Sequence, residues 1–312
     1  MAIGRFLFLL AVLTLIAFLA VGCDLQPTEP SIVPSPVVRN THTPVPAHLP
    51  IPVETVTPGL SLTPPQWRQA SQGIPAQTSV ADVAIAPSDH LAIYLAAYEP
   101  GGIYRSADGG QTWRPACGGL ETLAPVALTV HPEDPGVAWV GTVQGAYRTI
   151  DGGQRWHLMT GLPSVPIYAL AASPGGVGLY AGGEAPGVWR SSDGGQTWSS
   201  ANLAGSVASV LSLAAAADGT AYAGTAGQGI WATQDGGETW RRVGGALAST
   251  HVTVLRALND GRLYARAEGH LYLSRDSGET WDVVGPPGFE VLSFATGPAG
   301  SEHLYLGSKG NA

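Results

Sequence analysis

Five aspartates recur at nearly equal spacing, and repeated carboxylates are the first residues to examine for metal binding or acid–base catalysis. They are Asp108, Asp151, Asp193, Asp235 and Asp276. Each belongs to an eight-residue segment that reads Ser/Thr-x-Asp-x-Gly-x-x-Trp and ends at Trp113, Trp156, Trp198, Trp240 or Trp281. One aspartate per repeat cannot converge with the others on a single ion. We therefore expect no metal ion and no cofactor.

The residues around each aspartate suit a tight turn instead. An aspartate side chain accepts hydrogen bonds from backbone N–H groups a few residues further on. Glycine supplies the positive φ that other residues resist, and tryptophan provides a large ring to bury between neighbouring strands. We expect all five aspartates and all five tryptophans to be structural.

The other chemistry-bearing side chains form no convincing catalytic set. Arg105, Arg148 and Arg190 are of the type that holds a carboxylate, but all three precede the Ser or Thr of the motif by one residue. Residues at one repeat position lie in different repeats and do not converge. The eight histidines show no ligand spacing, and the chain has only two cysteines. We assign no catalytic residue.

The spacing of the motif identifies the elements that carry it. Successive motif tryptophans are 43, 42, 42 and 41 residues apart. Within one period, apolar segments at 165–171, 179–182 and 187–190 predict three short strands, and the motif turns the chain into a fourth strand that starts at the tryptophan. Four short strands per period of about 42 residues are typical of a β-propeller blade. The fold class predicted is therefore all-β, a propeller of four-stranded blades.

The motif resembles the Asp-box, or BNR, repeat of sialidases, sortilin-type receptors, some xyloglucanases and the photosystem II assembly-factor family. This resemblance implies that the Asp-box turns lie on one face and two other sets of loops on the opposite face. The opposite loops contain Glu268 and the candidate binding residues Tyr98, Glu99, Glu121, Glu184 and Glu290. The Arg-Ile-Pro element and the Tyr-Glu pair of sialidases are not identifiable, which argues against that activity.

The ends of the repeat array predict how the ring closes. Five full periods run from about Val80 to Val284, Trp67 begins a lone fourth strand, and 292–296 with 303–307 predict a first and a second strand. Joining these pieces gives six blades, five complete and one without its third strand. A sequence truncated at its C-terminus, with seven blades, is the alternative.

The N-terminal part differs from the repeats in composition. Residues 1–22 have one arginine followed by an apolar stretch and small residues, which indicates a secretory signal peptide. Cys23 resembles the lipid-modified cysteine of bacterial lipoproteins, and an uncleaved membrane anchor is the alternative. Residues 23–65 are rich in Pro and Thr, which is typical of an extended tether. The propeller is expected over 66–312.

Charge and composition narrow the function. The net charge of −8 and the single lysine, Lys309, argue against nucleic acid as a partner. We expect a lipid-anchored protein on the extracytoplasmic face of a bacterial cell membrane, acting as a non-catalytic binding or scaffolding module for a protein or carbohydrate. The alternatives are a secreted glycoside hydrolase of the sialidase or xyloglucanase type, and an assembly factor for a membrane protein complex.

Overall fold

Short antiparallel strands make up nearly all of the regular secondary structure in the part of the chain that the structure describes. The computed structural model describes residues 21–23, 67–99, 101–120, 124–184, 187–201, 203, 208–285, 290–296 and 304–308. One short 3₁₀ helix, η1 (Gly245–Leu247), interrupts the strands. Among the described residues, no helix has the length and apolar character required to span a membrane.

Five antiparallel sheets, named blades 1 to 5 in chain order, each contain four consecutive strands. Blade 1 contains β3 (Ser79–Ala86), β4 (Asp89–Glu99), β5 (Gly102–Ser106) and β6 (Arg114–Pro115), and blade 2 contains β7 (Pro125–Val130), β8 (Ala138–Thr142), β9 (Gly145–Thr149) and β10 (His157–Leu158). Blade 3 contains β11 (Ile167–Ala172), β12 (Leu179–Gly183), β13 (Val188–Ser191) and β14 (Ser199–Ala201). Blade 4 contains β15 (Val210–Ala215), β16 (Ala221–Thr225), β17 (Ile230–Thr233) and β18 (Arg241–Val243), and blade 5 contains β19 (Val252–Ala257), β20 (Leu263–Ala267), β21 (His270–Ser274) and β22 (Asp282–Val284).

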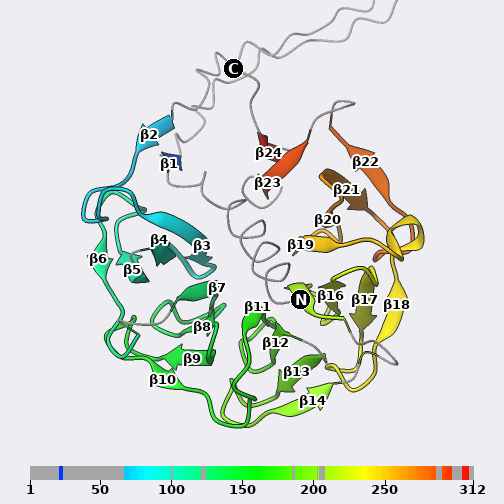
Figure 1. The fold of residues 1–312 in the computed structure, drawn as a ribbon, viewed down its shortest axis with the longest axis horizontal. Coiled ribbons are helices and arrows are strands. Elements are labelled where there is room, and N and C mark those ends of the chain that lie inside the picture. The colour runs from blue at the N-terminus through cyan, green and yellow to red at the C-terminus, as the bar shows by residue number, and fades with distance from the viewer. Residues whose placement is uncertain are drawn as a thin grey trace, which may run out of the picture.

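The blades follow one another around a central axis, with the first strand of each blade innermost and the fourth outermost (Figure 1). The first strands of consecutive blades contact each other from β3 to β19. Apolar side chains fill the space between blades, as in the cluster that joins Tyr94 of blade 1 to Leu128 and Trp156 of blade 2. The all-β propeller with four-stranded blades is confirmed.

Four further strands lie beside blades 1 and 5. β23 (Val291–Thr296) pairs with β24 (Leu304–Ser308), and β1 (Val21–Cys23) pairs with β2 (Trp67–Gln69). The segment after β2 contacts blade 1 as the end of one blade contacts the next. Trp113 donates hydrogen bonds from Nε1 to the Ala70 oxygen (3.0 Å) and from its backbone nitrogen to the Gln72 oxygen (2.8 Å). Trp156 donates in the same way to Ala116 and Gly118 of blade 1.

β2 therefore stands where the fourth strand of a blade preceding blade 1 belongs. The six-blade arrangement places β2 in one sheet with β23 and β24, but among the described strands β2 pairs with β1. The predicted domain boundary at 22/23 falls within β1, and residues 24–66 lie outside the described residues.

One predicted boundary shifts. The fourth strands begin one residue after the motif tryptophan, at Arg114 in blade 1 and His157 in blade 2. The reason is that the backbone N–H groups of Trp113 and Trp156 bond to the preceding segment rather than to their own sheet.

Consecutive blades approach each other closely at a glycine in the second strand. A Cβ atom placed on Gly141 would lie 2.5 Å from the Ile167 oxygen, and one placed on Gly224 would lie 2.8 Å from the Val252 oxygen. Because both oxygens belong to the first strand of the following blade, the backbone itself blocks a side chain. Gly307 occupies the same position in β24, but there a Cβ would meet the flexible Ser293 side chain at 2.5 Å.

We expect Gly141→Ala to lower the free energy of unfolding by about 1–3 kcal/mol, because the extra methyl group forces blades 2 and 3 apart. Urea denaturation followed by tryptophan fluorescence measures this loss. Gly307→Ala is the matched control and is expected to cost clearly less, because a side chain can move where a backbone carbonyl cannot. Equal losses in the two variants would contradict this account of blade spacing.

Candidate functional site

The repeated aspartates are fully engaged within their own turns. In blade 3 the Ser191 hydroxyl donates to Asp193 Oδ1 (2.7 Å), and Thr197 donates from its backbone nitrogen to Oδ1 (2.9 Å) and from its hydroxyl to Oδ2 (2.6 Å). The Ser191 hydroxyl oxygen also accepts from the backbone of Gly195 (2.8 Å). Blades 1, 4 and 5 repeat this pattern.

These contacts hold the aspartates ionised. The threonine hydroxyls, with the backbone N–H groups next in effect, lower the pKa of Asp108 and of Asp276 to about 2. The pKa of Asp193 is lowered further for the same reason. Among the described residues, no group of three or more His, Cys, Asp or Glu side chains is placed to hold a metal ion.

Blade 2 contains a natural variant of this turn. Arg155 stands where the other blades have threonine. Asp151 accepts from the backbone nitrogen of Arg155 (3.0 Å) and from the Thr149 hydroxyl (2.8 Å). The Arg155 N–H is the main cause of the lowered pKa of Asp151.

The difference between the two turns predicts different costs of removing charge. We expect Asp193→Asn to lower the melting temperature at pH 7 by about 2–5 °C, because the carboxylate accepts from several donors at once. Asp151→Asn is expected to lower it by less, because no threonine hydroxyl is lost. Differential scanning calorimetry of both variants provides the comparison.

The same cause fixes the pH dependence. In the folded protein the pKa of Asp108 and of Asp276 lies below the usual 3.8. The stabilisation that each ionised aspartate gives to its turn is therefore present above about pH 4, and it is lost as the pH falls through the pKa of the folded state. The parent protein and Asp276→Asn should therefore converge in stability as the pH falls to about 2. A gap between them that stays constant from pH 6 to pH 2 would show that the charge has no part in the turn.

The three arginines that precede the motif, Arg105, Arg148 and Arg190, lie at different blade boundaries. The Arg105 guanidinium lies 5.5 Å from the centre of the Tyr94 ring of its own blade, and a Cβ placed on Gly152 of blade 2 would lie 3.5 Å from Arg105 Nε. Arg190 donates to the Gly236 oxygen (3.4 Å) and to Glu238 (3.2 Å) in the turn of blade 4. A Cβ placed on Gly194 would lie 4.0 Å from Arg148, which places Arg148 against the turn of blade 3. Each arginine thus contacts the following blade, and the three do not converge.

Asp82 is an acid that sequence reasoning missed. It lies at a bulge of β3 and accepts from the backbone nitrogens of Val83 (2.8 Å) and Leu128 (2.7 Å). Burial raises the pKa of Asp82, and Arg256 opposes part of that shift. Since Leu128 belongs to β7, this carboxylate links blades 1 and 2 and has a structural role.

The candidate binding residues lie on the face opposite the repeated turns. Because each blade is an antiparallel meander, the connections between second and third strands and those between blades share one face. Tyr98 and Glu99 end β4, Glu184 follows β12, Glu268 follows β20, and Glu290 precedes β23. Glu121 lies outside the described residues.

The structure brings Glu268 and Glu290 together and surrounds them with residues that the sequence did not connect. Glu268 Oε1 accepts from the backbone nitrogen of His251 (3.0 Å) and lies 3.4 Å from His251 Nδ1. His270 Nδ1 lies 2.9 Å from the Glu268 carbonyl oxygen. A Cβ placed on Gly269 would lie 3.3 Å from Glu290 Cγ.

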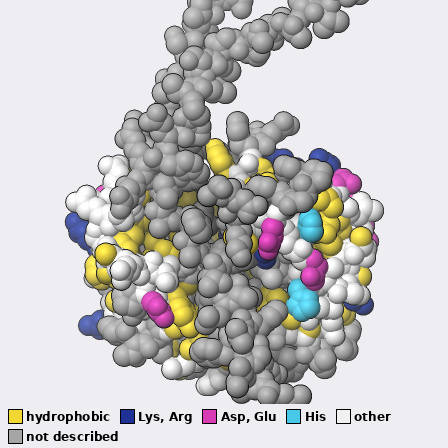
Figure 2. Space-filling model, turned by 45° about the horizontal axis from the view of Figure 1, so that its top comes forward, with side chains coloured by type: hydrophobic (Ala, Val, Ile, Leu, Met, Phe, Trp, Pro, Cys, Tyr) yellow, Lys and Arg dark blue, Asp and Glu magenta, His cyan; other side chains and the backbone are white. Residues whose placement is uncertain are grey.

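A buried arginine lies beneath this group. Arg266 is 7% exposed, and its guanidinium donates to the Val291 oxygen (2.6 Å) and to the Thr253 hydroxyl (2.7 Å). Burial lowers the pKa of Arg266, and Glu290 opposes part of that shift. We name His251, Arg266, Glu268, His270 and Glu290 the Glu268 cluster. Figure 2 shows histidine and acidic side chains close together on one side of the view.

The pKa of Glu268 does not suit the general acid of a glycoside hydrolase. The N–H of His251 is the largest of the causes that lower the pKa of Glu268. The general acid of a glycoside hydrolase needs a raised pKa, because it must carry a proton at working pH. Glu268 is instead an ionised acceptor that is partly exposed.

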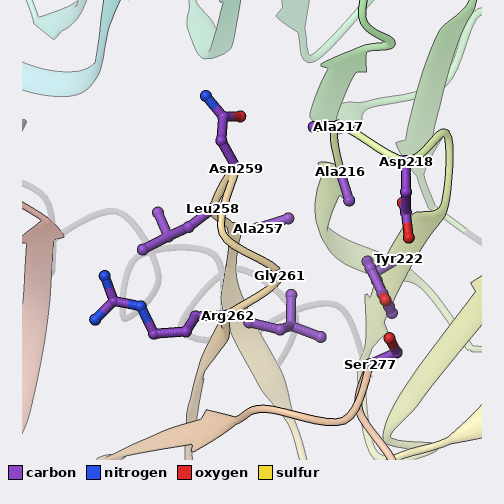
Figure 3. A pocket seen from close by; sticks show the side chains of 11 residues that line it. Ala216, Ala217, Asp218, Tyr222, Ala257, Leu258, Asn259, Gly261, Arg262 and Ser277 are labelled. Carbon is purple, nitrogen blue, oxygen red and sulfur yellow. The ribbon is translucent and has the colours of Figure 1, made fainter. Parts of the chain in front are cut away.

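A small pocket lies on the other face, between blades 4 and 5. It has a volume of about 70 Å³ and its lining includes Asp218, Tyr222, Arg262 and Ser277. Figure 3 shows the Tyr222 and Ser277 side chains pointing toward each other, and Arg262 pairs with Asp260 (2.7 Å). The volume is well below the several hundred Å³ typical of ligand pockets, roughly 300–1,000 Å³.

Comparison with known proteins identifies the fold. No protein-family model and no curated protein matches the chain. Among solved structures, an ancestral GH74 enzyme has 23% identity and a TM-score of 0.55, covering 69% of this chain and 31% of its own. The GH74 xyloglucanase from Xanthomonas campestris has 21% identity and a TM-score of 0.56, with coverages of 70% and 40%. YCF48 bound to D1 peptide has 19% identity and a TM-score of 0.55, with coverages of 72% and 74%.

The chain thus spans less than half the length of both GH74 proteins. At these identities the likeness concerns the fold alone. The chain is a β-propeller, and its described residues include five complete four-stranded blades.

Proposed function

We propose that this protein is a non-catalytic binding module and that the Glu268 cluster contacts its ligand. The observation that supports this most directly is the ionised, partly exposed Glu268 beside Glu290 on the face opposite the repeated turns. Two carboxylates at one site attract a cationic group, and the net charge of −8 strengthens that attraction at long range. A polypeptide segment with Lys or Arg has the matching chemistry.

A peptide ligand agrees with one of the similar structures. YCF48 was solved with a bound D1 peptide, so a propeller of this kind binds a polypeptide segment. We further propose that the repeated turns are Asp-box repeats, in which the aspartates stabilise blades while the opposite loops bind. An assembly or scaffolding role follows if the ligand belongs to a membrane protein.

The Glu268→Gln/Glu290→Gln double variant tests the binding site. Its probe is a fluorescent heptalysine peptide, followed by anisotropy in buffer of low ionic strength. We expect the apparent affinity to fall about three- to tenfold, because exposed charge pairs each contribute about 0.2–1 kcal/mol. Glu99→Gln/Glu184→Gln is the matched control, since it removes the same number of charges from the same face in blades 1 and 3.

An equal loss in the control would assign the binding to net charge alone. No binding by the parent protein would remove the cationic ligand from the proposal.

A glycoside hydrolase is the second candidate, because two of the similar structures are GH74 proteins. Turnover of xyloglucan or of a sialoside by the purified protein would replace the binding module with that enzyme.

We also propose that Cys23 carries lipid and attaches the propeller to the extracytoplasmic face of a bacterial membrane. The support is the apolar segment of residues 6–21 and the small residues before Cys23. Expressed in a bacterial host with radiolabelled palmitate, the parent chain should take up label and partition into detergent. Cys23→Ser should lose the label and keep its N-terminal residues. Labelling that persists in Cys23→Ser would refute the anchor.

A further inference from the structure

Two histidines flank Glu268, and each ring faces this residue through the same nitrogen. His251 Nδ1 lies 3.4 Å from Glu268 Oε1, and His270 Nδ1 lies 2.9 Å from the Glu268 carbonyl oxygen. Because an ionised carboxylate and a carbonyl oxygen can only accept hydrogen bonds, Nδ1 carries the proton in both rings. A second proton on either ring therefore goes to Nε2, and both contacts with Glu268 persist when the ring becomes charged.

Both histidine rings are accessible to solvent. The side chain of His251 is 48% exposed, and His270 is exposed as well. His251 packs against the turn between β16 and β17 of blade 4, where a Cβ placed on Gly227 would lie 3.5 Å from the ring. His270 lies edge-on to Tyr272, with 6.4 Å between the ring centres. The two rings can therefore exchange protons with water while they remain in contact with Glu268.

The charged side chains that face these rings come from blades 4 and 5 and from the segment before β23. Glu268 and Glu290 are the acidic groups, Arg266 lies beneath them, and Arg242 of β18 donates to the Ala248 oxygen in the segment before β19. An arginine in a protein keeps its charge, and a backbone N–H group lowers the pKa of Glu268. Histidine, in contrast, is the side chain that ordinarily changes charge between pH 5 and pH 8.

Protonation of the two histidines reverses the charge of the Glu268 cluster. With neutral imidazoles the cluster has two carboxylates and one guanidinium, an excess of one negative charge. With both imidazoles charged it has three cations and two carboxylates, an excess of one positive charge. The contact of His251 with Glu268 then becomes an ion pair, so that the carboxylate already has a cationic partner.

We propose that the Glu268 cluster is a pH-sensitive switch, in which protonation of His251 and His270 releases a cationic ligand that Glu268 and Glu290 bind at neutral pH. The inference rests on the proposed function, because it concerns the regulation of the same site. Each new positive charge competes with the ligand for Glu268 and repels the charge of the ligand itself.

The pH dependence of peptide binding tests the switch on the full-length protein. The probe is an N-acetylated fluorescent heptalysine peptide, whose lysines keep their charge from pH 5.5 to pH 8. Anisotropy is measured in buffer of low ionic strength. We expect the apparent affinity of the parent protein to fall about three- to tenfold between pH 8 and pH 5.5, because the new charges are partly exposed and screened. Tryptophan fluorescence at both pH values checks that the fold is unchanged.

Histidine variants separate the switch from other effects of pH. His251→Asn/His270→Asn keeps a donor near the position of Nδ1 but cannot gain a proton. It should bind as the parent protein does at pH 8 and keep that affinity at pH 5.5. His90→Asn/His157→Asn is the matched control, because it removes two other exposed histidines. The control should retain the pH dependence of the parent protein.

The possible outcomes distinguish the switch from the binding site itself. Equal binding by the parent protein at pH 8 and pH 5.5 would overturn the switch and leave the proposed function intact. Dependence on pH that persists in His251→Asn/His270→Asn, or that disappears equally in the control variant, would also overturn it. Unfolding at pH 5.5 would assign the release to loss of the fold instead. Absence of binding at both pH values would overturn the proposed function and the switch together.

Discussion

The contact between consecutive blades is the constraint on which this structure depends. A four-stranded blade has apolar side chains on both faces and cannot bury them alone. Its stability therefore comes from stacking one blade on the next. Backbone-to-backbone approach at Gly141 and the hydrogen bonds from Trp156 to blade 1 set that spacing. A repeat that met its neighbour through different groups in each blade would not close into a regular ring.

The repeated turn is the local part of the same solution. Both carboxylate oxygens of its aspartate accept hydrogen bonds from residues of the same eight-residue turn. The arginine before the motif contacts the turn of the next blade in blades 1 to 3. At the boundary of blades 4 and 5, where Ala232 precedes the motif, Arg241 pairs with Glu279 instead (2.6 Å). The motif face is therefore occupied by its own bonding. The opposite loops lack this repeated hydrogen bonding and differ in sequence between blades.

The Glu268 cluster forms around an exception in the repeat. Blades 2 to 4 have glycine at the position that Arg266 occupies in blade 5. A guanidinium group there replaces direct backbone contact with hydrogen bonds to Val291 and Thr253. A buried cation needs acidic neighbours, and Glu290 supplies one. The departure from glycine is visible in the sequence, but its link to two histidines is not.

The sequence alone determined the period, the strand order within a blade and the residues of the turn, because all three depend on neighbours within about ten residues along the chain. It placed the fourth strands one residue early, because the tryptophan N–H bonds to another blade. Only the tertiary structure decided that His251 meets Glu268, that Asp82 meets Leu128, and that β24 is less buried than its counterparts. These contacts join residues of different blades or loops, and no local pattern specifies which side chains the closing of a ring brings together.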